Sequence, residues 1–373
     1  MFESGYNHID GILKVLEKFI KIYACSRAKF FLSTKIMSFE NPQKSLEKQD
    51  SSLEVMKMPE IVVREERGAQ LFSLLLKAEN PEWGETETPL AKETAEHFRD
   101  NPIDPEILKT IKDLHREGAD EETLYNLALT YQNQERAEKI LEMATKYKPH
   151  IKNPQEIYRK FSALLENFNE IFSASPLAEK FATEIEQDKN ERLQRLEETG
   201  KRIELLIDFF KPDSKTTDVK KISFIPTDPL YKKNFGRNFS AFPGEQIIIS
   251  HIDNTDNQDH EFLHGIINPI VEKLSKQLTD EQKEKIFNLA KAELKQDYGE
   301  EYFSLLCEEF IRTYIEAFKN KSREYSEVFE KNSLRGLIFE LYQEYSDRSN
   351  KETVNFEQFV LKNFPDRIKN LPQ

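Results

Sequence analysis

The sequence predicts a mainly α-helical fold with one small β-sheet, an α+β arrangement. Charged residues make up 32% of the 373-residue chain and only 11 residues are glycine, a composition that favours helices over sheets. Apolar residues recur at helical spacing along much of the chain, and β-branched runs typical of strands are few and short. The length suffices for the cores of two or three domains.

The first 58 residues are expected to form a poorly ordered extension. Residues 9–31 have the pattern of a basic amphipathic helix, because Lys, Arg and Glu interrupt the apolar positions. The same interruptions exclude a signal peptide and a transmembrane span. Residues 38–58 are polar and resemble a linker. An alternative for residues 9–31 is contact with a membrane surface or a partner.

Residues 59–211 are predicted to form a helical domain. A short strand is expected over residues 60–65 and a buried helix over 70–76. Asp or Asn caps mark further helix starts at Asp104, Asp120 and Asn133. An aromatic stripe over residues 155–172 indicates a helix that packs into the core, and one long helix is expected from 177 to 210.

Residues 212–373 are predicted to form a third region, which begins with a small sheet. Strands are expected over residues 221–226 and 245–250, with a turn at 242–244 between them. The run Gln246–Ser250 is either an edge strand, to which a peptide can add as another strand, or an ordinary buried strand. A helix capped within residues 254–257 follows directly.

The most informative motif of the chain lies on that helix. His260-Glu261-Phe262-Leu263-His264 has the form H-E-x-x-H. Residues four apart share one helix face, so His260 and His264 can direct two imidazoles at one metal ion. Glu261 follows the first ligand and can serve as a general base towards a metal-bound water. The alternative is a surface helix with two solvated His and a Glu.

Zinc requires a third protein ligand and an open position for water. The helix predicted around residues 302–315 carries Glu308 and Glu309 in apolar company. Helical phase places Glu308 on the apolar face and Glu309 about 100° around the helix, on a more polar side. We therefore expect Glu308 to be the ligand, with Glu309 in reserve. The alternative is a pair of solvated acids that interact with Arg312.

Two further polar residues are candidates for the surroundings of the metal. Asn268 lies four residues beyond His264 and either holds a ligand or substrate carbonyl or is a simple buried amide. Arg312 lies one turn after Glu308. It either orients that carboxylate and stabilises an oxyanion or forms a structural ion pair.

These residues resemble those of a known class of enzymes. His260, Glu261 and His264 followed by Glu308 are similar to the gluzincin class of zinc metallopeptidases. The stretch from His260 to Pro269 resembles more closely an uncharacterised bacterial family, a domain of unknown function with H-E-F-x-H followed by Asn-Pro. Leu263 and Gly265 depart from that pattern, at positions that are not ligands. The resemblance implies a zincin-like catalytic region, with the helical N-terminal region packed on it, and Zn²⁺ as cofactor.

The favoured function is that of a zinc-dependent metallohydrolase, a peptidase whose zinc-activated water attacks peptide bonds with Glu261 as general base. The alternative is a helical protein-interaction or scaffold protein with a structural or inactive zinc site. The expected partner is a peptide or protein substrate; the natural substrate, endo- or exopeptidase action and the oligomeric state are left open. A net charge of −13 argues against a nucleic-acid partner. Cys25 and Cys307 form no disulfide framework, which favours a reducing, cytoplasmic location, and Cys307 is expected to be a packed thiol.

Overall fold

The computed structural model describes most of the chain after its first 53 residues. The described residues are 54–80, 88–147, 151, 153–226, 230, 236–290, 294–295, 302–319, 333–349 and 354–370. The amphipathic segment predicted over residues 9–31 and most of the linker predicted over 38–58 lie outside them. The described part is mainly helical with one four-stranded mixed sheet, which confirms the predicted fold class. No helix of this part is both long and apolar enough for a membrane span.

The chain divides into two compact units, one comprising Leu53–Ile266 and the other including Ile267–Gln373. The division falls inside a single helix, α10 (Thr255–Ser275), which carries the H-E-x-x-H motif. The two units are defined by compactness alone. They do not test the domain boundary predicted near residue 211, which stays a prediction.

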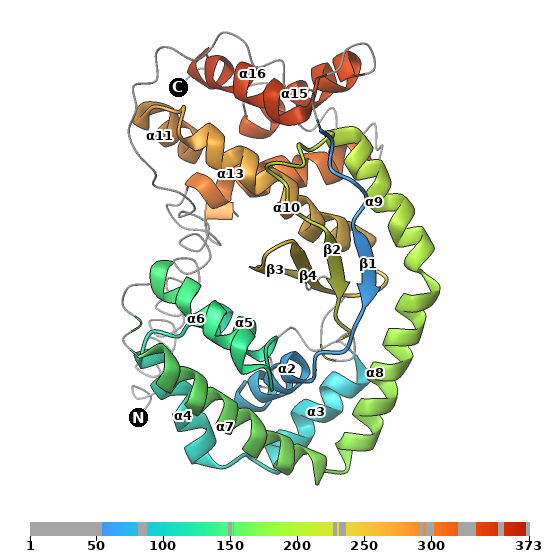
Figure 1. The fold of residues 1–373 in the computed structure, drawn as a ribbon, viewed down its shortest axis with the longest axis vertical. Coiled ribbons are helices and arrows are strands. Elements are labelled where there is room, and N and C mark those ends of the chain that lie inside the picture. Colours follow the sequence, from blue (N-terminus) through green and yellow to red (C-terminus); the bar gives the residue numbers. More distant parts are fainter. Residues whose placement is uncertain are drawn as a thin grey trace, which may run out of the picture. The chain divides into compact units, whose positions relative to one another are not determined.

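The sheet belongs to the first unit and has the strand order β1-β2-β4-β3 (Figure 1). Strand β1 (Glu60–Val63) runs parallel to β2 (Lys221–Phe224), which runs parallel to β4 (Glu245–Ser250). Strand β3 (Gly236–Phe242) is antiparallel to β4 and lies at the edge. A tight turn joins β3 to β4, and Gly244 has a φ of 74°, a conformation that favours glycine.

The proposal that Gln246–Ser250 forms an edge strand is wrong. These residues belong to β4, which has β2 on one side and β3 on the other, and residues 246–250 are all buried. The continuous apolar run therefore marks a strand covered on both faces, as the alternative interpretation held. The edge strands are β1 and β3, and β3 was not predicted from the sequence.

The helices that follow β1 as far as α7 build a buried apolar core in the first unit. They are α2 (Arg67–Glu79), α3 (Pro89–Asp100), α4 (Pro105–Arg116), α5 (Glu121–Ala128), α6 (Gln134–Tyr147) and α7 (Pro154–Ser173). The side chains of Asp104 and Asp120 accept hydrogen bonds from the first turns of α4 and α5, as the sequence predicted. The aromatic stripe of α7 is buried in this core, among residues that include Phe72 and Tyr125.

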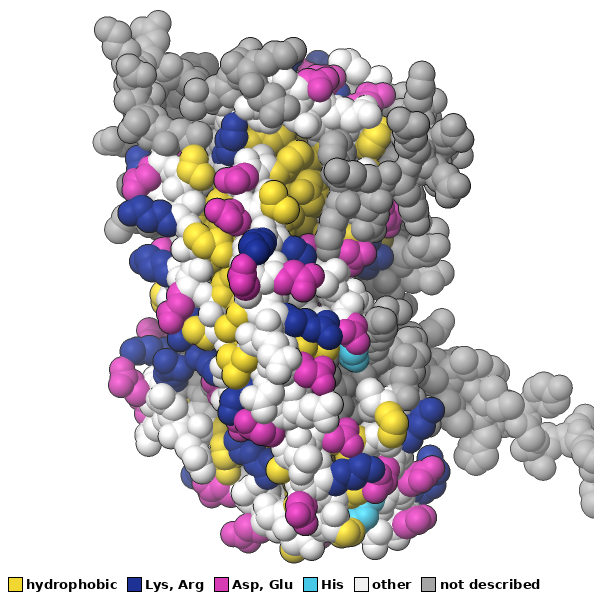
Figure 2. Space-filling model, turned by 90° about the vertical axis from the view of Figure 1, so that its right-hand side faces the viewer, with side chains coloured by type: hydrophobic (Ala, Val, Ile, Leu, Met, Phe, Trp, Pro, Cys, Tyr) yellow, Lys and Arg dark blue, Asp and Glu magenta, His cyan; other side chains and the backbone are white. Residues whose placement is uncertain are grey.

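Residues 177–210 form two helices rather than the single long helix expected. Helix α8 (Leu177–Gln194) ends at Arg195, and α9 (Leu196–Phe210) follows at once. No glycine or proline stands at this break, so no local signal marks it. Both helices contact β1. Along their outward face, acidic and basic side chains intermingle, including the Lys201–Glu197 pair at 2.6 Å (Figure 2).

Among its described residues, the second unit contains the C-terminal part of α10 and four further α-helices with defined bounds. These are α11 (Asp280–Leu289), α13 (Tyr302–Tyr314), α15 (Leu334–Ser349) and α16 (Phe356–Asn370), and a π-helix, η2 (Ile315–Lys319), continues α13. Aromatic rings on α13, α15 and α16 form the core. The Tyr342 ring stacks on Phe356 with centroids 4.9 Å apart, and Phe310 meets both.

Candidate metal centre

Helix α10 begins shortly after β4 ends, and side-chain hydrogen bonds hold the connection. The Asn254 side chain accepts a hydrogen bond from the Asn257 backbone N–H at 2.9 Å, which is the cap predicted from residues 254–257. The Gln258 amide donates to the carbonyls of His251 and Ile252 at 3.2 and 3.0 Å. The start of the motif helix is thereby tied to the end of a central strand.

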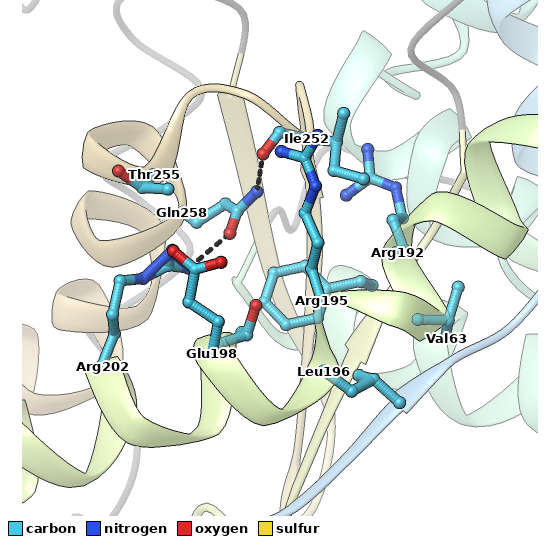
Figure 3. Close-up of a pocket in the computed structure, with 11 residues that line it drawn as sticks. Val63, Arg192, Arg195, Leu196, Glu198, Arg202, Ile252, Thr255 and Gln258 are labelled. Carbon is cyan, nitrogen blue, oxygen red and sulfur yellow. Dashed lines mark hydrogen bonds between the residues drawn. The ribbon is translucent and has the colours of Figure 1, made fainter.

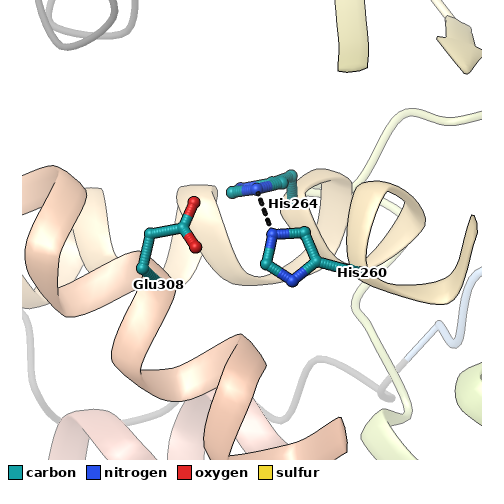
Figure 4. Close-up of side chains that lie close together, drawn as sticks. All are labelled: His260, His264 and Glu308. Carbon is teal, nitrogen blue, oxygen red and sulfur yellow. Dashed lines mark hydrogen bonds between the residues drawn. The ribbon is translucent and has the colours of Figure 1, made fainter. Parts of the chain in front are cut away.

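The two motif histidines face each other one turn apart on α10. Their Nε2 atoms are 3.2 Å apart, and the ring centroids are separated by 4.9 Å at an interplanar angle of 76° (Figure 4). Two nitrogen ligands at about 2.0–2.1 Å from a tetrahedral zinc ion lie about 3.3 Å from each other. The spacing of His260 and His264 therefore fits two ligands of one zinc ion. Both side chains are half-buried, which leaves access for water.

Glu308 on α13 completes a group of three potential ligands. One nitrogen each from His260 and His264 and one oxygen of Glu308 all lie within 4.8 Å of one another. Figure 4 shows the Glu308 carboxylate directed towards the two imidazoles. Two imidazoles and a carboxylate are a donor set that zinc accepts in catalytic sites. Among the described residues, no other group of His, Cys, Asp and Glu meets this criterion.

Arg312 supports the carboxylate of Glu308 from one turn further along α13. Its Nε donates to Glu308 Oε2 at 3.0 Å. Glu308 is 2% exposed, whereas about a third of the Arg312 side chain reaches solvent. The contact is both an ion pair and a means to orient the carboxylate, so the two roles considered for Arg312 are compatible.

Glu309, the reserve ligand, has a different partner. It is 0% exposed, and its Oε2 accepts from Arg335 Nε on α15 at 2.6 Å. Arg335 also donates to Glu316 on η2 at 2.7 Å. The alternative of two solvated acids at 308 and 309 is therefore wrong. Glu309 was expected to lie on a more polar side of its helix. That side is buried, and the polar group that it meets there is the buried guanidinium of Arg335.

Glu261 is buried at the junction of α10 with the sheet, 6% exposed. Its backbone carbonyl accepts a hydrogen bond from Gln246 Nε2 at 2.8 Å, so β4 holds this turn of the helix. A Cβ atom on Gly265 would lie 3.1 Å from Gln246 Oε1. Gly265, one of the departures from the resembled family, thus leaves room for the Gln246 amide. Sequence analysis assigned no role to Gln246, whose only signal was a polar residue inside an apolar strand.

The other residues considered for the site are placed as follows. Asn268 is buried on α10. Cys307 is buried, and burial raises the pKa of its thiol well above the usual value, as expected of a packed thiol rather than a nucleophile.

A separate small pocket, of about 30 Å³, lies between the α8–α9 junction and the first turn of α10 (Figure 3). Three arginines line it, and each has an acidic neighbour. The pairs are Arg192–Asp188 at 2.7 Å, Arg195–Asp253 at 2.8 Å and Arg202–Asp259 at 3.4 Å. The arginine charges are thus balanced within the protein, and the pocket makes no case for an anion site.

Comparison with protein-family models, with curated proteins and with solved structures finds no match to this chain. The resemblance to gluzincins therefore stays a prediction that depends on the motif residues.

Proposed function

We propose that this protein is a zinc-dependent metallohydrolase and, more specifically, a peptidase. One observation carries the proposal: His260, His264 and Glu308 form a compact group of zinc-type ligand atoms. A buried glutamate, Glu261, directly follows the first of them, as a general base next to the metal requires. A cytoplasmic location and a peptide or protein substrate remain parts of the same proposal.

The roles of the residues follow from their chemistry. His260, His264 and Glu308 would hold the ion, and Arg312 would keep the Glu308 carboxylate oriented. When bound, zinc supplies a Lewis acid for the scissile carbonyl and activates a water molecule. Glu261 would act as the general base towards the attacking water and would return the proton to the leaving amine when the carbon–nitrogen bond breaks.

The first test is metal analysis of the purified full-length protein. About one zinc per chain is expected, because the described part of the chain contains one group of potential ligands. His264→Ala should abolish zinc binding. The matched control is His97→Ala, which removes a half-buried histidine from helix α3 and should leave zinc unchanged. Zinc retained by His264→Ala would refute the proposed site.

The second test separates an enzyme from a protein with a structural zinc. A peptide library is incubated with wild-type protein and with Glu261→Gln, and cleavage is read by mass spectrometry. Glu261→Gln should retain zinc and abolish cleavage, since it removes the proton acceptor but no ligand. Equal cleavage by both proteins would disprove the general-base role. A zinc-loaded wild type that cleaves no peptide would favour the scaffold alternative.

A further inference from the structure

The side chain of Glu261 lies against the strand β3 at Gly236. A Cβ atom on Gly236 would lie 2.7 Å from Glu261 Oε1 and 3.2 Å from Asn257 Nδ2. Asn257 and Glu261 are one turn apart on α10, so their side chains share the helix face that meets the strand. Even a methyl group at position 236 would compete for the space that the Glu261 carboxylate fills.

The backbone does not require a glycine at this position. Among the described residues, the glycines with positive φ are Gly118 and Gly244, so Gly236 has a conformation open to other residues. Gly236 also pairs with Ser250 in the regular antiparallel ladder. Glycine in a strand costs conformational entropy and often marks a close approach of another group. Here that group is the carboxylate of Glu261.

The backbone of Glu261 has little freedom to give way. Gln246 is buried in the central strand β4, and its Nε2 donates to the carbonyl of Glu261 at 2.8 Å and to that of Phe262 at 3.3 Å. A side chain at 236 would therefore displace the flexible end of Glu261 rather than the helix. Ordinary van der Waals contact would require the carboxylate oxygen to move by roughly 0.7 Å.

We propose that Gly236 is a positioning residue for Glu261: its missing side chain lets the edge strand fix where the general-base carboxylate lies. The inference rests on the proposed function, because only a reaction that uses Glu261 gives this position a catalytic consequence. Gly236 itself takes no part in proton transfer.

Gly236→Ala tests the inference, with Gly200→Ala as matched control. A Cβ on Gly200 would meet only ordinary contacts at 3.8 and 3.9 Å. Gly236→Ala should bind zinc as the wild type does and keep KM near the wild-type value, while kcat falls roughly 10- to 100-fold. Gly200→Ala should match the wild type throughout.

A crystal structure of metal-free Gly236→Ala shows directly whether residue 236 sets the position of the Glu261 carboxylate, and it requires no measurement of peptidase activity. The Glu261 carboxylate should be displaced and the α10 backbone unchanged. Any of three results would overturn the inference. They are an undisplaced Glu261 carboxylate, a wild-type kcat for Gly236→Ala, and an unfolded Gly236→Ala when Gly200→Ala is folded. If a zinc-loaded wild type cleaves no peptide, the proposed function fails, whereas the crystal structure still reports on Gly236.

Discussion

The adjacent acids Glu308 and Glu309 should respond in opposite ways to the same substitution. Glu308 belongs to the group of potential zinc ligands, whereas Glu309 forms an ion pair with Arg335. Glu308→Gln and Glu309→Gln each replace a carboxylate by an amide of the same shape. The first should weaken zinc binding with little effect on the metal-free fold. The second should destabilise the fold and leave the zinc ligands in place.

The burial of each pair sets the magnitudes. Removing one partner of a buried ion pair lowers the free energy of unfolding by about 3–5 kcal/mol when the remaining charge has no other partner. Arg335 retains Glu316, which is partly exposed, so Glu309→Gln should cost less, about 2–3 kcal/mol. Arg312 reaches solvent, so Glu308→Gln should cost the metal-free protein at most about 1 kcal/mol. Zinc affinity should fall more than about 100-fold, beyond the usual effect of an outer-shell residue.

The assay has two parts, both on full-length protein. Urea unfolding of the metal-free variants, followed by far-ultraviolet circular dichroism, measures stability. Competition with a zinc chelator measures affinity. The reasoning fails if Glu309→Gln loses zinc while Glu308→Gln retains it, since α13 would then present the other acid. It also fails if Glu309→Gln unfolds at the wild-type urea concentration, since the pair with Arg335 would then contribute nothing.

Three further predictions concern packing and titration. Gly68→Ala should destabilise the protein by at least about 3 kcal/mol in urea unfolding, because its Cβ would lie 2.1 Å from the backbone oxygen of Ala128; stability equal to that of Gly200→Ala would contradict this. Cys307 should resist alkylation at pH 8 until the protein unfolds, because burial raises its pKa and little thiolate forms; rapid labelling of folded protein would argue against a packed thiol. Burial also raises the pKa of Tyr342 and Tyr345. Because the unfolded phenols ionise first, their contribution to stability should be lost as the pH rises above about 10, and urea midpoints that do not change above pH 10 would oppose it.

The sequence by itself determined the features that depend on local geometry. Residues four apart on a helix face each other, so the spacing of His260 and His264 already implied the pair of imidazoles seen in the structure. Helix starts at Asp104 and Asp120 followed from side-chain caps, which act within one turn. The strand over residues 245–250 followed from a β-branched apolar run.

The tertiary structure decided everything that depends on contacts between distant segments. Strand order follows from pairing across the unit, so an apolar run could not show whether β4 was central or β3 the edge. Helical phase separated Glu308 from Glu309, but the burial of both depends on what packs against α13, and Arg335 comes from another helix. Gly236 had no distinguishing local pattern. Its importance lies in the Glu261 carboxylate that folding brings against it, which no periodicity encodes.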